Sequence, residues 1–276
     1  MTSLTWVRRY LSLLGVMEAP PGQDGLRRLV RAQVEGVPFE NSNSLLRRRD
    51  AGVGPVRPID PEALLASWEA RRSGGVCFEH TEMFGRLLSA LGYDVTPIAG
   101  EISFPGSHQA LVAALDGGRW LVDVGNGAPF FEPVPLDRPF EIERLGLGYR
   151  FHVDPADPGV WIQERVVEGS SKPYCRYLLE PQSAEEREVA YQRHHRPRET
   201  WVTNALVLIR SREEEVLVFR NMDQHRYTGA GKVSSRVEDP EAWARLPALL
   251  GLPGLPVREV VQAWAEVNGE SLPRGI

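Results

Sequence analysis

The amino-acid sequence predicts a protein of the α+β class in which a helical, a β-rich and a mixed region follow one another. Three observations predict this class. Apolar residues recur at helical spacing through about the first 90 residues. Short strand-like runs separated by proline and glycine follow them, and helical spacing returns over residues 240–267. We find no internal repeat and no linker long enough to force separate folding units.

Three helices are expected before the first glycine-rich segment. The first ends at Gly15, a plausible helix stop, and the second begins at a cap formed by Asp24. The third covers residues 61–71, because Pro61 suits the first position of a helix. The apolar positions of the first two helices are Leu4, Val7, Leu11, Leu14, Leu26, Leu29, Val30 and Val34.

The middle of the chain is expected to be mainly β. A strand over residues 94–102 precedes two apolar runs, residues 108–115 and 119–124, which flank a D-G-G turn and therefore predict a β-hairpin. We interpret the proline-rich stretch 129–139 as a surface connection. Further strand-like segments cover residues 159–164, 174–180, 204–209 and 215–221.

The bulk properties exclude several classes of protein. A net charge of −5 gives no reason to expect nucleic-acid binding. No apolar run approaches the roughly 18 residues of a membrane span, and the start of the chain does not look like a signal peptide. The 2 cysteines, Cys77 and Cys175, cannot form a dense disulfide framework. We therefore expect a cytoplasmic protein with no membrane partner, in which Cys77 is a free thiol.

Cys77 is the first candidate for chemistry. It follows Gly74, Gly75 and Val76 and opens an apolar helix that Gly92 ends. Free backbone N–H groups and the positive end of the helix dipole stabilise a thiolate at such a position. The alternative is a small buried hydrophobic residue, as most free cysteines are.

A thiolate nucleophile needs a base and a residue that orients the base. His108 begins the first strand of the predicted hairpin, and Asp123 lies near the end of the second. The two are not equidistant from the turn, so a bulge or an offset is required to bring them together. A surface histidine and a turn-capping aspartate are the alternatives.

Other candidates are weaker. His80 lies on the helix of Cys77 itself, where the geometry for a base is poor, and Cys175 is expected in a strand core. The adjacent His194 and His195 have no further ligand at a useful spacing, so no metal site is expected.

Four motifs together resemble the arylamine N-acetyltransferases. Residues 73–84, SGGVCFEHTEMF, resemble that family's R-G-G-x-C-F-E-x-N-x-x-F block. Residues 37–41 read VPFEN, as in the family. His108 with the apolar residues after it, then RWLVDVGNG at 119–127, resemble the family's H-x-x-L and W-L-V-D-V-G-F-G strands. Residues 195–208 are similar to a later segment that ends in F-x-x-x-L.

The resemblance implies a cysteine-protease-like core in three parts. A helical bundle over residues 1–93 would carry the nucleophile, a β-barrel-like domain over 94–200 the histidine and aspartate, and an α/β lid would span 201–276. It also implies ping-pong acyl transfer. Acetyl-coenzyme A would be a co-substrate rather than a tightly bound cofactor, and a small-molecule amine, an arylamine or hydrazine, would accept the acetyl group.

The resemblance further implies roles for individual residues. Cys77 would be the nucleophile, His108 the proton carrier and Asp123 its orienting partner. Glu40 would form a buried ion pair, for which Arg72 or Arg71 would replace the usual arginine. Residues expected to contact the acceptor are Phe39, Val76, Asn126 and Trp201, and residues expected to border the coenzyme cleft are Pro105, Gly106, Ser107, Gly125 and Gly127.

Several positions depart from the family pattern. Ser73 replaces arginine, Thr81 replaces asparagine and Ser42 stands where leucine is typical. Asn126 replaces a pocket phenylalanine, and with the small Val76 it predicts a roomier, more polar pocket. These departures leave more than one acceptor and more than one acyl donor compatible with the sequence. The alternatives are amide synthesis from another thioester, which a carrier protein could deliver, thioester hydrolysis, and a non-enzymatic binding role with an unreactive Cys77.

Overall fold

Helices dominate the N-terminal part of the chain, and the computed structural model describes residues 3–17, 21–71, 73–167, 169–237 and 240–271. The helices are α1 (Leu4–Leu14), α2 (Gln23–Gly36), α3 (Ser42–Ala51), α4 (Pro61–Arg71) and α5 (Cys77–Ala90). Three of the predicted helices have the expected bounds or end where expected, because caps and apolar spacing are local signals. Helix α3, which is rich in arginine and has no clear apolar face, was not predicted.

The predicted cap at Asp24 is wrong. Gly22 precedes α2, and the helix already begins at Gln23, so Asp24 lies in its first turn. The positive end of the helix dipole still stabilises a carboxylate in that turn.

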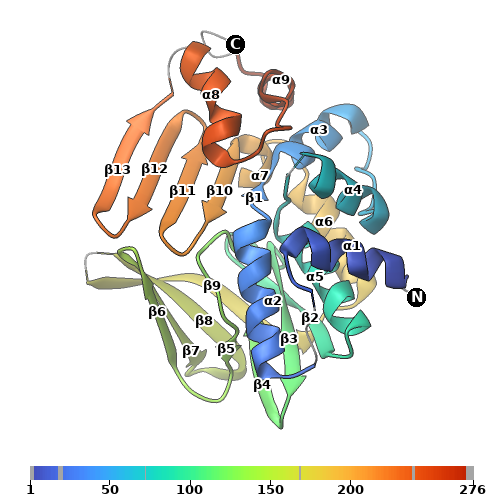
Figure 1. The fold of residues 1–276 in the computed structure, drawn as a ribbon, viewed down its shortest axis with the longest axis vertical. Helices are drawn as coiled ribbons and strands as arrows, with labels where there is room; N and C mark the ends of the chain where they lie inside the picture. The colour runs from blue at the N-terminus through green and yellow to red at the C-terminus, as the bar shows by residue number, and fades with distance from the viewer. Residues whose placement is uncertain (1–2, 18–20, 72, 168, 238–239, 272–276) are drawn as a thin grey trace.

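Eight described strands form one antiparallel sheet that curls toward a barrel (Figure 1). Its order is β5-β4-β3-β2-β9-β8-β7-β6. The strands are β2 (Asp94–Glu101), β3 (His108–Leu115), β4 (Gly118–Val122), β5 (Val134–Pro135), β6 (Phe140–Arg144), β7 (Leu147–Asp154), β8 (Asp157–Val167) and β9 (Ser170–Pro181). The predicted hairpin is therefore confirmed as β3 and β4.

Strand β3 is buried on both of its faces, which explains its uninterrupted apolar sequence. Leu111 and Ala113 face a core shared with the N-terminal helices. Ala110 and Val112 face the interior of the curled sheet, together with Cys175. The hairpin that starts at His108 is thus fixed between the helices and the sheet interior.

The stretch 129–139 is not the surface connection that we expected. Phe130, Phe131 and Val134 are buried, and β5 within this stretch pairs with β4. Phe130 packs edge-on against Tyr149. The prolines led us to expect an exposed segment, but the aromatic residues between them belong to the core.

A second antiparallel sheet, with the order β1-β10-β11-β12-β13, lies beside the first (Figure 1). Its first strand, β1 (Phe39–Glu40), comes from the N-terminal part of the chain. The others are β10 (Val207–Ser211), β11 (Glu215–Arg220), β12 (Asp223–Thr228) and β13 (Gly231–Arg236). The predicted strand 204–209 begins too early, because the short helix α7 (Trp201–Asn204) occupies its start.

Helices α6 (Ala184–His194), α8 (Pro240–Leu250) and α9 (Val257–Asn268) complete the described elements. α8 and α9 pack on the second sheet through an apolar core that includes Phe219 and Trp243. The helical, β-rich and mixed order confirms the predicted α+β class, while the three domain boundaries remain a prediction. In the part of the chain that the structure describes, no helix is both long and apolar enough to cross a membrane.

Candidate active site

Two glycines bring the chain to Cys77 along a path that no other residue could follow. A side chain at Gly74 would place its Cβ 1.7 Å from the Pro38 carbonyl oxygen, and one at Gly75 would lie 2.7 Å from the Glu79 Cβ. The Gly75 carbonyl accepts a hydrogen bond from the Glu40 N–H at 2.9 Å. Cys77 is then the first residue of α5 and is only 1% exposed. Its sulfur therefore lies at the positive end of a helix dipole, away from bulk water.

The hairpin places Asp123 near His108, although the two residues are not directly opposite each other in the strand pairing. β3 and β4 pair in a regular register from Leu111 opposite Val122 to Leu115 opposite Gly118, without a bulge. Continuing this register places Asp123 two residues out of line with His108, on the same face of the sheet. The His108 Nε2 lies 2.8 Å from the Asp123 Oδ2, and both side chains are 2% exposed.

His108 is held in its protonated form by its neighbours. Burial alone would lower the pKa of His108, but the charges of Asp123 and Cys77 and the hydrogen bonds to both outweigh burial and raise it well above its usual range. Since Nε2 donates to Asp123, the other ring nitrogen, Nδ1, is left for Cys77. This arrangement can supply a proton to a leaving group and take one from a nucleophile.

Asp123 has more partners than the sequence predicted. Its Oδ2 also accepts hydrogen bonds from the Tyr177 hydroxyl at 2.7 Å and the Asn126 Nδ2 at 3.0 Å, and its Oδ1 accepts from the Gly125 N–H at 3.2 Å. Burial alone would raise the pKa of Asp123, but the positive His108 and these donors hold it below its usual range. Asp123 is therefore an anion with its lone pairs occupied.

Tyr177 and Gln163 were missed by sequence reasoning. They come from β9 and β8, and the Tyr177 hydroxyl lies 2.8 Å from the Gln163 Oε1. Asn126 joins them, because its Nδ2 is 3.1 Å from the same oxygen. Nothing local in the sequence links these residues to Asp123, since the pairing of distant strands brings them together.

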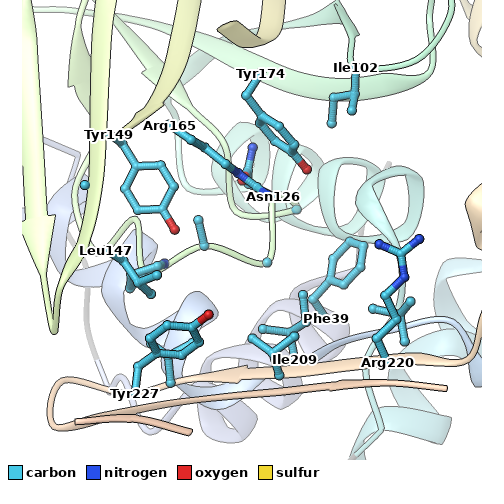
Figure 2. A pocket seen from close by; sticks show the side chains of 18 of the residues that line it. Phe39, Ile102, Asn126, Leu147, Tyr149, Arg165, Tyr174, Ile209, Arg220 and Tyr227 are labelled. Atoms are coloured by element: carbon cyan, nitrogen blue, oxygen red, sulfur yellow. The ribbon is translucent and has the colours of Figure 1, made fainter. Parts of the chain in front are cut away.

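A cavity of about 440 Å³ opens beside the triad, between the two sheets (Figure 2). It reaches His108 and Gly125. A side chain at Gly125 would place its Cβ 2.7 Å from the Cys77 Cα, so glycine lets this loop approach the nucleophile closely. The cavity thus reaches His108, and Gly125 at its edge lies against Cys77.

Five of the residues that we expected at the acceptor site or the coenzyme cleft line this cavity: Phe39, Gly125, Asn126, Gly127 and Trp201. Phe39 and Trp201 stack with their ring centroids 5.7 Å apart. Asn126 turns its amide N–H toward Asp123, so its side chain both borders the cavity and supports the triad.

The other expected contacts do not line the cavity. Val76 is fully buried beside Cys77 and is not among the cavity residues, because it occupies the position before α5. Pro105, Gly106 and Ser107 also lie outside its lining. The Ser107 hydroxyl instead accepts hydrogen bonds from the backbone N–H groups of residues 102–104, which closes the turn before β3.

The expected ion pair of Glu40 is absent among the described residues. The Ser42 hydroxyl and the Ser42 N–H both donate to Glu40, and the Gly74 N–H donates at 3.1 Å. Burial nevertheless raises the pKa of Glu40. The donors to Glu40 are thus a serine hydroxyl and backbone N–H groups rather than the expected arginine. Arg72 lies outside the described residues.

A different ion pair supports the nucleophile helix. Arg47 of α3, which sequence reasoning did not single out, pairs with the fully buried Glu79, and its guanidinium also donates to the Tyr191 hydroxyl at 2.6 Å. Glu79 accepts the Val76 N–H at 3.0 Å and so caps α5. Burial would raise the pKa of Glu79, but Arg47 and these bonds lower it.

His80 and Cys175 are placed as the sequence indicated. His80 is buried away from the cavity, and burial lowers its pKa to about 4. Cys175 belongs to the core of the curled sheet, where burial raises its pKa to about 12. Among the residues that the structure describes, no group of three His, Cys, Asp or Glu side chains could hold a metal ion.

The chain is similar in sequence to known proteins. The chain is 34% identical over 141 residues to an arylamine N-acetyltransferase of Mycolicibacterium smegmatis, covering 46% of this chain and 49% of that protein. It is 29% identical over 168 residues to the proansamycin X synthase of Amycolatopsis mediterranei, covering 58% and 62%. These alignments span about half to three fifths of the relatives' length.

The fold extends further than these alignments. The structure of the Mycobacterium marinum arylamine N-acetyltransferase in complex with CoA superposes with a TM-score of 0.80 at 21% identity, covering 95% of this chain and 99% of that one. A family model for N-acetyltransferases matches residues 24–247, which include Cys77, His108 and Asp123. The chain therefore belongs to the N-acetyltransferase family.

Proposed function

We propose that the protein transfers an acetyl or other acyl group from coenzyme A to an amine through a thioester on Cys77. The observation that carries the proposal is the buried alignment of Cys77, His108 and Asp123 beside a cavity. Membership of the N-acetyltransferase family supports the reaction class, and the CoA bound to the M. marinum relative supports the donor. An arylamine or hydrazine is the proposed acceptor.

In the first half-reaction, the Cys77 thiolate attacks the thioester carbonyl of the donor. The carbon–sulfur bond to coenzyme A breaks, and His108 gives its proton to the departing thiolate. The backbone N–H of Cys77, at the start of α5, is one donor for the oxyanion. Cys77 is left acylated and His108 neutral.

In the second half-reaction, the amine attacks the acyl carbon on Cys77, and neutral His108 takes the proton that the amine loses. The carbon–sulfur bond to Cys77 breaks, so the amide leaves and the thiolate–imidazolium pair is restored. Asp123 holds Nε2 and thereby keeps Nδ1 toward Cys77 in both steps. Protons and electrons balance over the cycle.

Intact-mass spectrometry with acetyl-coenzyme A and no amine tests the nucleophile. We expect one acetyl adduct on the native protein and on Cys175→Ala, and none on Cys77→Ala. Adding an aromatic amine should remove the adduct and produce one amide per adduct. An adduct that persists in Cys77→Ala would exclude the proposed mechanism.

The same mixture distinguishes acyl transfer from hydrolysis. Thiol release from acetyl-coenzyme A should stop at one equivalent without an amine and continue when an amine is added. Continuous release without an amine would identify a thioester hydrolase instead.

Amide synthesis from a carrier-bound thioester is the second candidate function. The similarity to a proansamycin X synthase favours it, and so does Asn126, which replaces the usual pocket phenylalanine. A panel of acyl-coenzyme A and acyl-carrier donors, read by adduct mass, separates the two. Acylation of Cys77 by carrier thioesters only would favour amide synthesis.

A further inference from the structure

A glutamine lies among apolar neighbours in the core of the curled sheet. Gln163 of β8 is 0% exposed. It pairs with Phe151 of β7 on one side and with Cys175 of β9 on the other, and Trp161, two residues before it, belongs to the same core. A buried amide must find hydrogen-bond partners, whereas an apolar side chain at this position would not need them. Packing alone therefore does not explain the glutamine.

The pairing of β8 with β9 is irregular at this residue. Gln163 lies opposite Cys175, but the next residue, Glu164, lies opposite Pro173, so Tyr174 has no residue opposite it. Such bulges bend a strand and redirect side chains, and they are frequent beside active sites. The irregularity thus lies where β8 and β9 supply side chains to the hydrogen bonds around Asp123.

Only one end of the Gln163 amide is bonded. Its Oε1 accepts a hydrogen bond from the Asn126 Nδ2 at 3.1 Å and lies 2.8 Å from the Tyr177 hydroxyl. Its Nε2 has no partner among the residues that the structure describes. A buried donor without a partner lowers stability. The function of the amide is therefore to be found in what its oxygen contacts.

Both groups that contact this oxygen also contact Asp123. The Tyr177 hydroxyl lies 2.7 Å and the Asn126 Nδ2 3.0 Å from the Asp123 Oδ2. The Asn126 Nδ2 carries two hydrogens, one for Asp123 and one for Gln163. The Asn126 Oδ1 has no partner in the described part of the chain, so the Nδ2 contacts alone orient that amide. Gln163 thus contacts the two side chains that hold Asp123.

We propose that Gln163 is a positioning residue, which keeps the Asp123 carboxylate aligned with the His108 Nε2 through Tyr177 and Asn126. The inference rests on the proposed acyl transfer, in which Asp123 orients His108 in both half-reactions. A hydrogen bond weakens steeply as its angle departs from linearity, so a rotated carboxylate would hold the imidazole less firmly. Gln163 does not line the cavity and therefore acts on the triad rather than on a substrate.

A second buried glutamine provides a matched control. Gln33 of α2 is also 0% exposed, and its Oε1 accepts a hydrogen bond from the Tyr10 hydroxyl at 2.8 Å. Its other end is bonded too, because its Nε2 lies 3.0 Å from the His80 Nδ1. Methionine has about the length of glutamine and lacks the amide. Gln163→Met and Gln33→Met therefore remove the same group from beside the triad and from beside a neutral histidine.

The two variants should separate activity from stability. Gln163→Met should lower kcat/KM by about 3- to 10-fold, the effect of one hydrogen bond, and should leave the urea midpoint of unfolding unchanged. The loss should be equal for acetyl-coenzyme A and for the amine, whose kcat/KM values report the first and the second half-reaction. Gln33→Met should instead lower the urea midpoint and keep both kcat/KM values within about twofold of native.

Three kinetic results would overturn the proposal. They are native kcat/KM in Gln163→Met, a loss confined to one substrate, and a loss that Gln33→Met matches. A double-mutant cycle with Asp123→Asn adds a test of the route, since Gln163→Met should have no further effect once the carboxylate is gone. An undiminished effect in that background would show that Gln163 does not act through Asp123.

NMR of the resting protein, with 15N-labelled histidine, keeps the test independent of acyl transfer. The His108 Nε2 proton, bonded to a buried carboxylate, should give a downfield resonance that is missing from His108→Ala. Gln163→Met should shift or broaden this resonance, and Gln33→Met should leave it in place. An unchanged resonance in Gln163→Met would refute the positioning role even if acyl transfer is confirmed. A changed resonance in a protein without acyl transfer would support positioning and refute only the proposed reaction.

Discussion

Two histidines, His108 on β3 and His80 on α5, differ in charge although both are almost fully buried. His108 is 2% exposed and His80 is 0% exposed. The pKa of His108 is raised well above its usual range, whereas burial lowers the pKa of His80 to about 4. Burial penalises the charged form of both rings, so their neighbours decide the difference.

The hydrogen-bond partners of His80 are neutral. The Tyr10 hydroxyl donates to the Gln33 Oε1 at 2.8 Å, and the Gln33 Nε2 lies 3.0 Å from the His80 Nδ1. The His80 Nε2 donates to the Pro38 carbonyl at 3.2 Å. This chain of donors assigns one proton to the ring and leaves it neutral, while Asp123 gives His108 a charged hydrogen-bond partner. The comparison teaches that a carboxylate, rather than a position beside the nucleophile in sequence, makes a base.

Replacing each histidine by alanine should have the largest and most unequal effects. His108→Ala should lower kcat/KM by about 10³-fold or more, because it removes the proton carrier of both half-reactions. His80→Ala should leave kcat/KM within about threefold and lower the free energy of unfolding by about 1–3 kcal/mol, because it strands Gln33 and the Pro38 carbonyl. Steady-state kinetics and urea unfolding measure both, and an inactive but stable His80→Ala would reverse the assignment.

Asp123→Asn should separate charge from shape at His108. We expect a loss of about 10²- to 10⁴-fold in kcat/KM, since the amide fills the same space without the charge. The pKa of His108 should fall toward about 6.5, so activity should decline at a lower pH on the alkaline side. The pH profile of kcat/KM measures this shift, and an unchanged alkaline limb would mean that Asp123 does not control the charge of His108.

The same pair makes stability depend on pH. The raised pKa of His108 gives stability that is complete below its unfolded value and is lost as pH rises through the folded value. The lowered pKa of Asp123 gives stability that is present above its unfolded value and is lost as pH falls through the folded value. In Asp123→Asn, the free energy of unfolding should be smaller between the folded pKa of Asp123 and the folded pKa of His108. It should also change less with pH at both ends of that range.

Tyrosine-to-phenylalanine changes remove one hydroxyl donor from the hydrogen bonds around His108 and one from those around His80. Tyr177→Phe removes a donor to Asp123 and should lower kcat/KM by about tenfold, because the orientation of Asp123 toward His108 is less fixed. Tyr10→Phe removes the donor to Gln33, so it should cost about 1 kcal/mol of stability and leave the pH profile unchanged. Equal effects of the two on activity would show that Tyr177 acts only as a packing residue.

The features around His108 divide into those that the sequence predicts and those that it does not. Helix α5 with Cys77 at its start and the hairpin from His108 toward Asp123 follow from local spacing, and both lie as expected. Tyr177 reaches Asp123 only through the order of strands in the curled sheet, which spacing does not encode. For the same reason, Arg47 could not be assigned to Glu79, since a helix without a clear apolar face gives no signal of its neighbours.

At Glu40 the structure differs from the ion pair that the resemblance implies. Ser42 and Ser73 both depart from the family pattern, and Ser42 donates to Glu40, whereas no cation among the described residues pairs with it. The Ser42 hydroxyl, two residues away, donates to the buried carboxylate without bringing a charge that must also be desolvated. Paired departures near one buried group are therefore best considered together.

The smallest predicted effect tests that substitution. Ser42→Ala keeps the Ser42 N–H bond to Glu40 but removes the hydroxyl donor, so it should lower the free energy of unfolding by about 1–2 kcal/mol. Ser44→Ala is the matched control, because Ser44 is buried on the same helix and makes no bond to Glu40. Urea unfolding of both variants at neutral pH should separate them, whereas equal stabilities would mean that the Gly74 and Ser42 backbone donors suffice. Activity should be retained in both, because Glu40 supports the segment before Cys77 and does not border the cavity.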